Sequence, residues 1–245
     1  MGIEDLSTLD ILHGILTSTF VIISIAVSLK ILLKYPKHKR IELLTVGIAW
    51  LGISTPWWGN SFSFLTYISF GFKLDLFTYL LIENAFIPIA LICWIYSFGA
   101  LAYPALKKKF LIIIGAICIP YEIFLISALI IEPTIIGTLE GMFDSKHTII
   151  PIAFRIFGLI VVLITGILFG RESMKSDNLV IKWKGRFLAI GIITFVVAAI
   201  LDVILILNPL ELIIVRGLLI LSAFEYYLGF FFSERLTNLL FKKRE

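Results

Sequence analysis

The chain has 245 residues, of which 60% are hydrophobic and only 16% are charged, and its mean hydropathy is +1.04. Soluble domains average about 45–50% apolar and about 25% charged residues, so the composition excludes an ordinary soluble domain and predicts a single-domain membrane protein. The formal net charge of +4 does not indicate nucleic-acid binding, because the charges are sorted by membrane side. Cys93 and Cys118 lie within apolar segments, which supports neither a disulfide framework nor a zinc site.

A membrane-spanning helix needs about 20 mostly apolar residues. Seven segments meet this requirement, and they predict an all-α bundle of seven transmembrane helices that forms one domain over residues 1–245. In chain order these spans are about 11–33, 41–58, 76–103, 110–131, 149–170, 187–208 and 211–232. The N-terminal stretch MGIEDLSTLD is acidic and lacks the basic region of a signal peptide, so the first segment is expected to be a true span.

Lysine and arginine residues are concentrated on one side of the predicted bundle. The connections on the other side contain only Lys73 and Lys146. The positive-inside rule therefore predicts a multi-pass protein of the cell membrane, with its N-terminus outside and its C-terminus in the cytoplasm. The residues 233–245 place leucines and a phenylalanine beside basic residues, as in a short amphipathic helix on the inner membrane surface.

Six ionisable side chains fall within the spans, where such residues are rare and mark functional sites by default. At about 1.5 Å of rise per residue, five of them lie roughly 8 to 14 Å from the outer ends of five different helices. These five are Glu83, Glu122, Arg155, Asp202 and Arg216. The sixth, Glu225, lies alone in the inner half. The helix faces that carry them are rich in small or polar residues, and such faces are expected to converge inside the bundle.

Two interpretations of the outer charges remain open. They can form an ion-pair network that fixes the register of the helices, or they can line an outward-facing pocket for a small polar or cationic ligand. The six ionisable side chains of the spans comprise two arginines and four carboxylates, counting Glu225. Two arginines cannot neutralise four carboxylates, so at least one acid must be protonated or meet a cation or water. The three histidines are too scattered to predict a metal site, and no serine or cysteine nucleophile has a histidine at matching depth, so catalysis is not expected.

Seven spans with an outer N-terminus resemble the rhodopsin and G-protein-coupled-receptor architecture in topology only. No lysine occurs between 211 and 232, so no retinal attachment, and no other cofactor, is expected. The stretches LGISTPWW (51–58), GTLEG (137–141) and RESMKSDNLVIKWKGRFL (171–188) resemble a family of uncharacterised seven-span membrane proteins from archaea. That resemblance implies an origin and a topology, but no activity.

The expectation that follows is a receptor- or sensor-like protein whose outer pocket is bounded by the five charges. Ligand binding would shift the last three predicted helices, and a cytoplasmic partner would detect this shift by binding at 171–186 and 233–245. The first alternative is a small-solute or proton-coupled transporter or channel, in which Glu225 serves as the inner relay. The second alternative is a structural or assembly subunit, in which the charges only fix the packing of the helices.

Overall fold

The computed structural model describes residues 6–204 and 208–232, and this part of the chain is almost entirely helical. Within it, six helical stretches are long and apolar enough to cross a membrane. They are Thr8–His38, Leu76–Ala102, Pro104–Ile131, Ile149–Met174, Leu179–Ile204 and Pro209–Phe231. The protein is therefore an all-α, multi-pass type of fold by length and composition. The predicted inner tail, 233–245, lies outside the described residues.

Five predicted spans correspond to single long helices in the structure. These are α1 (Thr8–Leu32), α7 (Lys107–Ile131), α8 (Ile149–Met174), α9 (Leu179–Ile204) and α10 (Pro209–Phe231). Helices α1 and α10 both begin with a capping box, in which Ser7 and Asn208 accept hydrogen bonds from backbone N–H groups of the first turn. A four-residue helix, α2 (Tyr35–His38), follows α1.

The predicted span 76–103 is broken into two helices, α5 (Leu76–Asn84) and α6 (Ile87–Ala102). The break lies just before Pro88, which has no backbone N–H to continue the ladder of hydrogen bonds and therefore favours a helix start. One carbonyl near the break, that of Glu83, accepts a hydrogen bond of 3.4 Å from the Thr55 hydroxyl. The broken helix places Glu83 at the end of α5, facing the interior.

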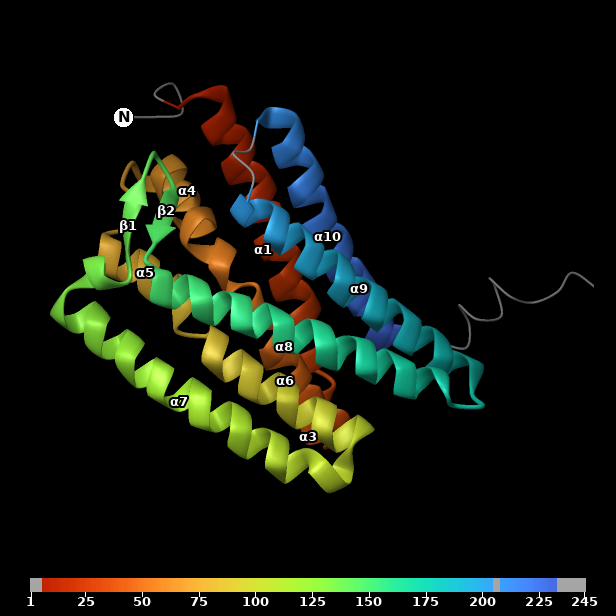
Figure 1. The fold of residues 1–245 in the computed structure, drawn as a ribbon. Helices are drawn as coiled ribbons and strands as arrows, with labels where there is room; N and C mark the ends of the chain where they lie inside the picture. Colours follow the sequence, from red (N-terminus) through yellow and green to blue (C-terminus); the bar gives the residue numbers. More distant parts are fainter. Residues whose placement is uncertain (1–5, 205–207, 233–245) are drawn as a thin grey trace, which may run out of the picture.

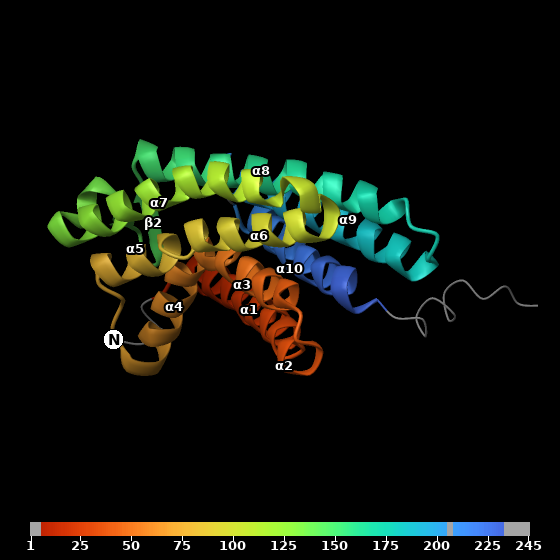
Figure 2. The same cartoon turned by 90° about the horizontal axis from the view of Figure 1, so that it is seen from below.

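The predicted span 41–58 differs from a simple transmembrane helix, and it is not among the six. Helix α3 (Ile41–Ile53) ends where Pro56 interrupts the ladder, a 3₁₀ turn follows over Thr55–Trp57, and the chain continues as α4 (Trp58–Phe70). Helix α3 packs along α1 and α6 (Figure 2). The seven-span count therefore depends on this bent segment.

Helix α6 occupies the middle of the molecule, with α7 and α8 on one side and α1 and α3 on the other (Figure 2). Helices α8, α9 and α10 follow one another as an antiparallel layer (Figure 1). Near the α8–α9 connection the two backbones are in close contact, because a Cβ on Gly185 would lie 3.0 Å from the Gly170 carbonyl oxygen. Toward their other ends α8 and α9 diverge (Figure 1).

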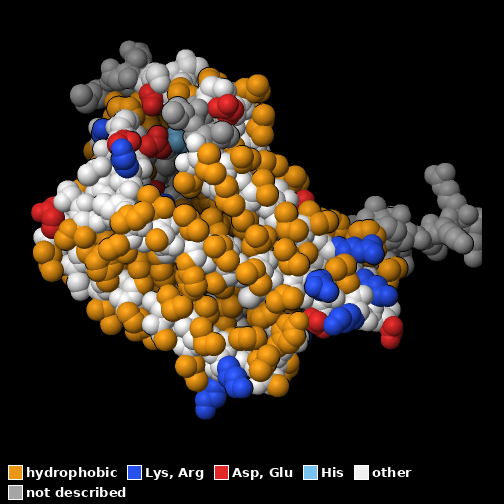
Figure 3. Space-filling view, in the orientation of Figure 1, with side chains coloured by type: hydrophobic (Ala, Val, Ile, Leu, Met, Phe, Trp, Pro, Cys, Tyr) orange, Lys and Arg blue, Asp and Glu red, His pale blue; other side chains and the backbone are white. Residues whose placement is uncertain are grey.

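A short antiparallel hairpin, β1 (Gly137–Glu140) paired with β2 (Asp144–His147), connects α7 to α8. It lies over the end of the bundle where α8 and α9 diverge, beside α4 and α5 (Figure 1). Basic side chains dominate the opposite end, around the α8–α9 connection, whereas most acidic side chains in view lie near the hairpin, and apolar side chains cover the surface between (Figure 3). Such sorting is typical of a protein that crosses a membrane.

Candidate functional site: a charged cavity beneath the hairpin

A cavity of about 630 Å³ lies beneath the hairpin, between the diverging ends of α8 and α9. Four of the five predicted outer residues line it: Glu83 from α5, Arg155 from α8, Asp202 from α9 and Arg216 from α10. Side chains from four helices that are distant in the sequence therefore meet at one place. The structure thus brings four of the five predicted outer residues together at one cavity.

Arg216 is buried, and each of its three guanidinium nitrogens has a partner. Its Nη1 donates to Asp202 Oδ1 at 2.7 Å and its Nε donates to Thr17 Oγ1 at 3.0 Å. Its Nη2 lies 2.7 Å from His13 Nε2, and because arginine can only donate, this histidine nitrogen is the acceptor. The other carboxylate oxygen of Asp202 accepts from the indole Nε1 of Trp57 at 2.9 Å. This half of the cavity wall is a closed ion-pair network.

The hairpin is joined to that network through Asp144. The Oδ2 of Asp144 lies 3.4 Å from His13 Nδ1, and its Oδ1 accepts from Asn60 Nδ2 at 3.0 Å. Burial would raise the pKa of Asp144, but the hydrogen bonds from His13 and Asn60 and the charge of Arg216 together lower it below its ordinary value. Asp144 is therefore ionised at neutral pH and ties the hairpin to α1 and α4.

A second network surrounds Glu83 and Arg155. The Nη2 of Arg155 lies 3.4 Å from Glu83 Oε2, 3.1 Å from Asn84 Oδ1 and 2.9 Å from His147 Nε2. The hairpin hydroxyl of Ser145 also donates to Glu83 Oε2, at 3.0 Å. Burial lowers the pKa of His147, and the neighbouring Arg155 charge lowers it further against the opposing effect of Glu83. The hairpin thus contacts both charged networks, and His147 is neutral at physiological pH.

Arg155 differs from Arg216 because half of its guanidinium group is unused. All of its hydrogen bonds to described residues leave from Nη2, and its buried Nε has no partner. The Oδ1 atom of Asn60, another cavity-lining residue, is also buried without a partner. Both of these atoms have almost no accessible surface, so Nη1 is the nitrogen of Arg155 that is left to donate to a ligand or to water in the cavity.

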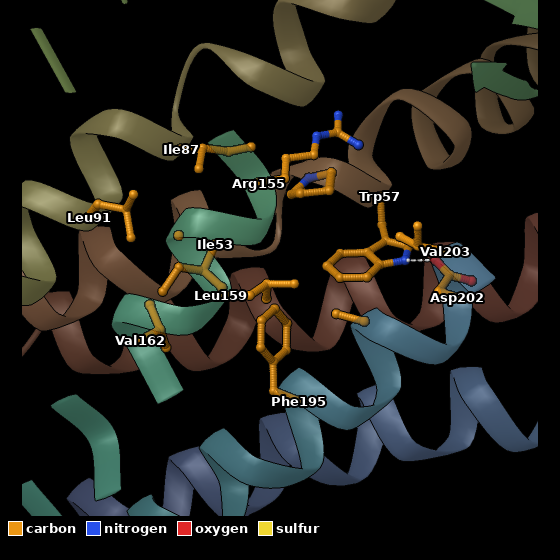
Figure 4. Close-up of a pocket in the computed structure, with 13 residues that line it drawn as sticks. Ile53, Trp57, Ile87, Leu91, Arg155, Leu159, Val162, Phe195, Asp202 and Val203 are labelled. Atoms are coloured by element: carbon orange, nitrogen blue, oxygen red, sulfur yellow. Dashed lines mark hydrogen bonds between the residues drawn. The ribbon is translucent and has the colours of Figure 1, made fainter. Parts of the chain in front are cut away.

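A second, smaller pocket of about 120 Å³ adjoins the charged cavity and is mostly apolar. Residues from α3, α6, α8 and α9 surround it, including Ile53, Leu91, Val162 and Phe195. Figure 4 shows Ile53, Val162 and Phe195 below Arg155, with Leu91 at the left. Six residues line both spaces: Pro56, Trp57, Arg155, Leu159, Asp202 and Val203. A charged space and an apolar space therefore share one wall.

Aromatic side chains close the inner side of both pockets. Trp57 packs against Phe195 with ring centroids 5.7 Å apart, Phe195 lies 5.6 Å from Trp50, and Trp50 stacks on Tyr226 at 4.1 Å. These four rings come from the 3₁₀ turn, α9, α3 and α10, and all four are buried. They separate the charged cavity from the basic end of the bundle.

The structure places two predicted residues away from the cavity. Glu122 lies on α7, which packs on α5 and α6, and it is not among the cavity-lining residues. Glu225 lies against Gly191 of α9, in the inner half of α10. One carboxylate oxygen of each glutamate, Oε2, is buried with no hydrogen-bond partner among the described residues.

Sequence reasoning missed the hairpin side chains that complete the site, namely Asp144, Ser145 and His147. The available signal was the Gly141 turn in GTLEGMFDSKH, where this glycine adopts a positive φ of 60°. His13 and His147 looked too distant from each other in the sequence to act together, yet each contacts a cavity arginine. A comparison with protein-family models and a search of curated proteins both found no match.

Proposed function

We propose that the chain is a receptor- or sensor-like membrane protein with seven crossings, whose charged cavity opens to the outside and binds a small ligand. The observation that carries this proposal is Arg155, which lines a cavity of about 630 Å³ and makes no hydrogen bond to a described residue through Nη1. An ion-pair network alone would not leave this nitrogen unpaired at a cavity wall. Arg216, whose three guanidinium nitrogens each have a partner, serves as the structural counterpart on the opposite wall.

The seventh crossing in this proposal is the bent segment formed by α3, the 3₁₀ turn and α4. Helix α3 lies between α1 and α6, which are both part of candidate membrane spans. A crossing by α3 returns the chain to the hairpin side before α4 begins, and the basic connections then lie in the cytoplasm. The distribution of charged side chains in Figure 3 supports this orientation.

The aromatic closure favours a receptor over a channel or transporter. A transported polar solute would have to pass the stacked rings of Trp50 and Tyr226, and neither of these residues lines the charged cavity, which therefore ends before them. A receptor instead needs a mechanical link to the inner side. Helices α8 and α9 supply one, because they carry Arg155 and Asp202 at the cavity and form the basic segment 171–186 at their other ends.

Proton-coupled transport is the second candidate, and Glu225 is the observation that favours it. Its Oε2 atom is buried and unpaired in the inner half of α10, as expected for an acid that takes up and releases protons. It lies nine residues, or about 13 Å of helix rise, from Arg216, with the aromatic rings between the two depths. Transport through this residue would require those rings to separate.

Side-specific labelling of a cavity residue tests the proposal. Leu159 lines both pockets, whereas Leu163 on the same helix lines neither. In a background with Cys93→Ala and Cys118→Ala, Leu159→Cys should react with a membrane-impermeant charged thiol reagent added on the hairpin side, and Leu163→Cys should not. Labelling of Leu159→Cys from the basic side would indicate alternating access and contradict the receptor assignment.

A further inference from the structure

We propose that the ligand is an amphiphile, with an anionic head that accepts hydrogen bonds from Arg155 and an apolar chain that lies in the pocket between α6, α8 and α9. This inference rests on the proposed function, because it names the class of ligand for the same cavity. The juxtaposition that carries it is the single wall shared by the charged and the apolar space.

The position of the ligand's anionic head group follows from the hydrogen-bond donor that Arg155 leaves unused. Arg155 Nη1 makes no hydrogen bond to a described residue, and an N–H of a guanidinium group can donate to a carboxylate or phosphate oxygen. The four cavity acids are already engaged. Glu83 accepts from Arg155 and Ser145, and Asp202 accepts from Arg216 and Trp57. Asp144 accepts from Asn60 with His13 beside it, and Glu140 lies 3.5 Å from the Lys146 amine.

The apolar chain of the ligand is placed in the apolar pocket, which Arg155 also lines. Gly158 follows Arg155 by one turn of α8 and lacks a side chain that would fill the space, since a Cβ there would lie 3.3 Å from Leu91. Leu91, Val162 and Phe195 form the remaining apolar wall (Figure 4). Burial of methylene groups in this pocket contributes about 0.8 kcal/mol each.

The ligand can enter sideways from the lipid, between the diverging ends of α8 and α9. Val203 lines both pockets and is 70% exposed, and Ile156 lines the charged cavity and is 49% exposed. Exposed apolar residues at this level of the bundle face hydrocarbon in a membrane. The lateral walls of the site are therefore continuous with the lipid-facing surface, and a chain longer than the pocket can extend into the bilayer.

Photocrosslinking with a diazirine-bearing fatty acid tests this inference on the full chain in micelles of dodecyl maltoside, an uncharged detergent. Crosslinks are expected at pocket residues such as Leu91 and Leu159. Oleate should compete at least tenfold more strongly than methyl oleate, because a hydrogen bond to a charged group contributes about 1.5–3 kcal/mol. Arg155→Met should abolish this difference, whereas Arg171→Met, on the same helix outside the cavity, should preserve it.

The comparison of head groups needs only the wild-type protein, so it remains decisive if Arg155→Met fails to fold. Equal competition by oleate, methyl oleate and oleylamine would indicate non-specific lipid contact and overturn the inference, as would stronger competition by oleylamine. Either result leaves the outward cavity of the proposed function intact if Leu159→Cys is still labelled from the hairpin side alone. Labelling from the basic side would instead overturn the proposed function.

Discussion

Arg155 Nη2 and His147 Nε2 lie 2.9 Å apart, and the chemistry of the pair fixes its protonation. Arginine has no acceptor atom, so His147 Nε2 must accept and its proton must reside on Nδ1. Protonation of His147 would convert this hydrogen bond into a contact between two cations. Asn84 Nδ2 and Glu83 Oε2 also lie 3.3 Å from the same nitrogen, so this histidine connects the hairpin to α5 and α8. Protonation would weaken its contact with Arg155 and favour the one with Glu83.

The stability of the protein should therefore decrease as the pH falls. Burial and Arg155 lower the pKa of His147 in the folded protein below its ordinary value of 6.5, which applies to the unfolded chain. At a pH between the folded and the unfolded pKa, the unfolded state therefore binds more protons than the folded state. The free energy of unfolding then rises with pH across that window and is reduced below about pH 6.5. Thermal midpoints measured from pH 5 to pH 8 should show this slope.

The His147→Gln variant is the matched test of that slope, because glutamine can accept from Arg155 but does not titrate. Its midpoint should change less with pH than that of the wild type, and hydrogen exchange of residues 137–147 should no longer accelerate at low pH. Asp144 does not interfere, since its lowered pKa moves its own stability loss below its ordinary value of 3.8. An unchanged slope in His147→Gln would assign the pH dependence to another group.

Removal of Arg216 should destabilise the protein strongly. Arg216→Met leaves Asp202 buried beside Trp57 without its cation and removes the donors to Thr17 and His13. Breaking one partner of a buried ion pair costs about 3–5 kcal/mol. The double variant Arg216→Met with Asp202→Asn should recover part of this loss, which denaturant unfolding in detergent would measure. Additive losses in the double variant would show that the two residues do not act as a pair.

Replacement of Glu225 should have the opposite effect on stability. Its buried Oε2 has no partner, so Glu225→Gln removes a carboxylate with one unpaired oxygen and should leave the thermal midpoint unchanged or raise it. Proteoliposomes containing a pH-sensitive dye should show no proton flux with either the wild type or the variant. A flux in the wild type that disappears in Glu225→Gln would establish the transporter alternative.

The tight contact between the inner halves of α8 and α9 predicts a difference between two glycines. A Cβ on Gly185 would lie 2.4 Å from the Cβ of Ser173, whereas a Cβ on Gly217 of α10 would have nothing within 4 Å. Gly185→Ala should destabilise the protein by about 1–3 kcal/mol through overpacking. Gly217→Ala should be neutral or stabilising, because alanine favours a helix by up to about 1 kcal/mol over glycine. Equal midpoints for the two variants would contradict this packing.

Most of the helical segments could be predicted from the sequence, because about 20 consecutive apolar residues have few alternatives to a membrane helix. The two breaks were harder to place. Pro88 and Pro56 are each the second residue of the helix or turn that follows a break. A proline alone, however, does not decide between a kink and two separate helices. Pro120 remains inside the continuous helix α7.

The candidate site could be predicted only along the helix axis. A rise of about 1.5 Å per residue fixes how deep a charge lies, and this was sufficient to group Glu83, Arg155, Asp202 and Arg216. Depth does not fix which neighbour a helix face meets, so Glu122 was grouped with them although α7 packs on α5 and α6. The hairpin contacts depend on long-range packing that no local pattern encodes.

Ligands should reach Arg155 from the hairpin side, and protection of Leu159→Cys tests this most directly. The thiol should react with an impermeant reagent added on that side, and saturating oleate should slow the reaction at least tenfold while methyl oleate has a smaller effect. Reaction from the basic side, or a rate that neither compound changes, would contradict the account.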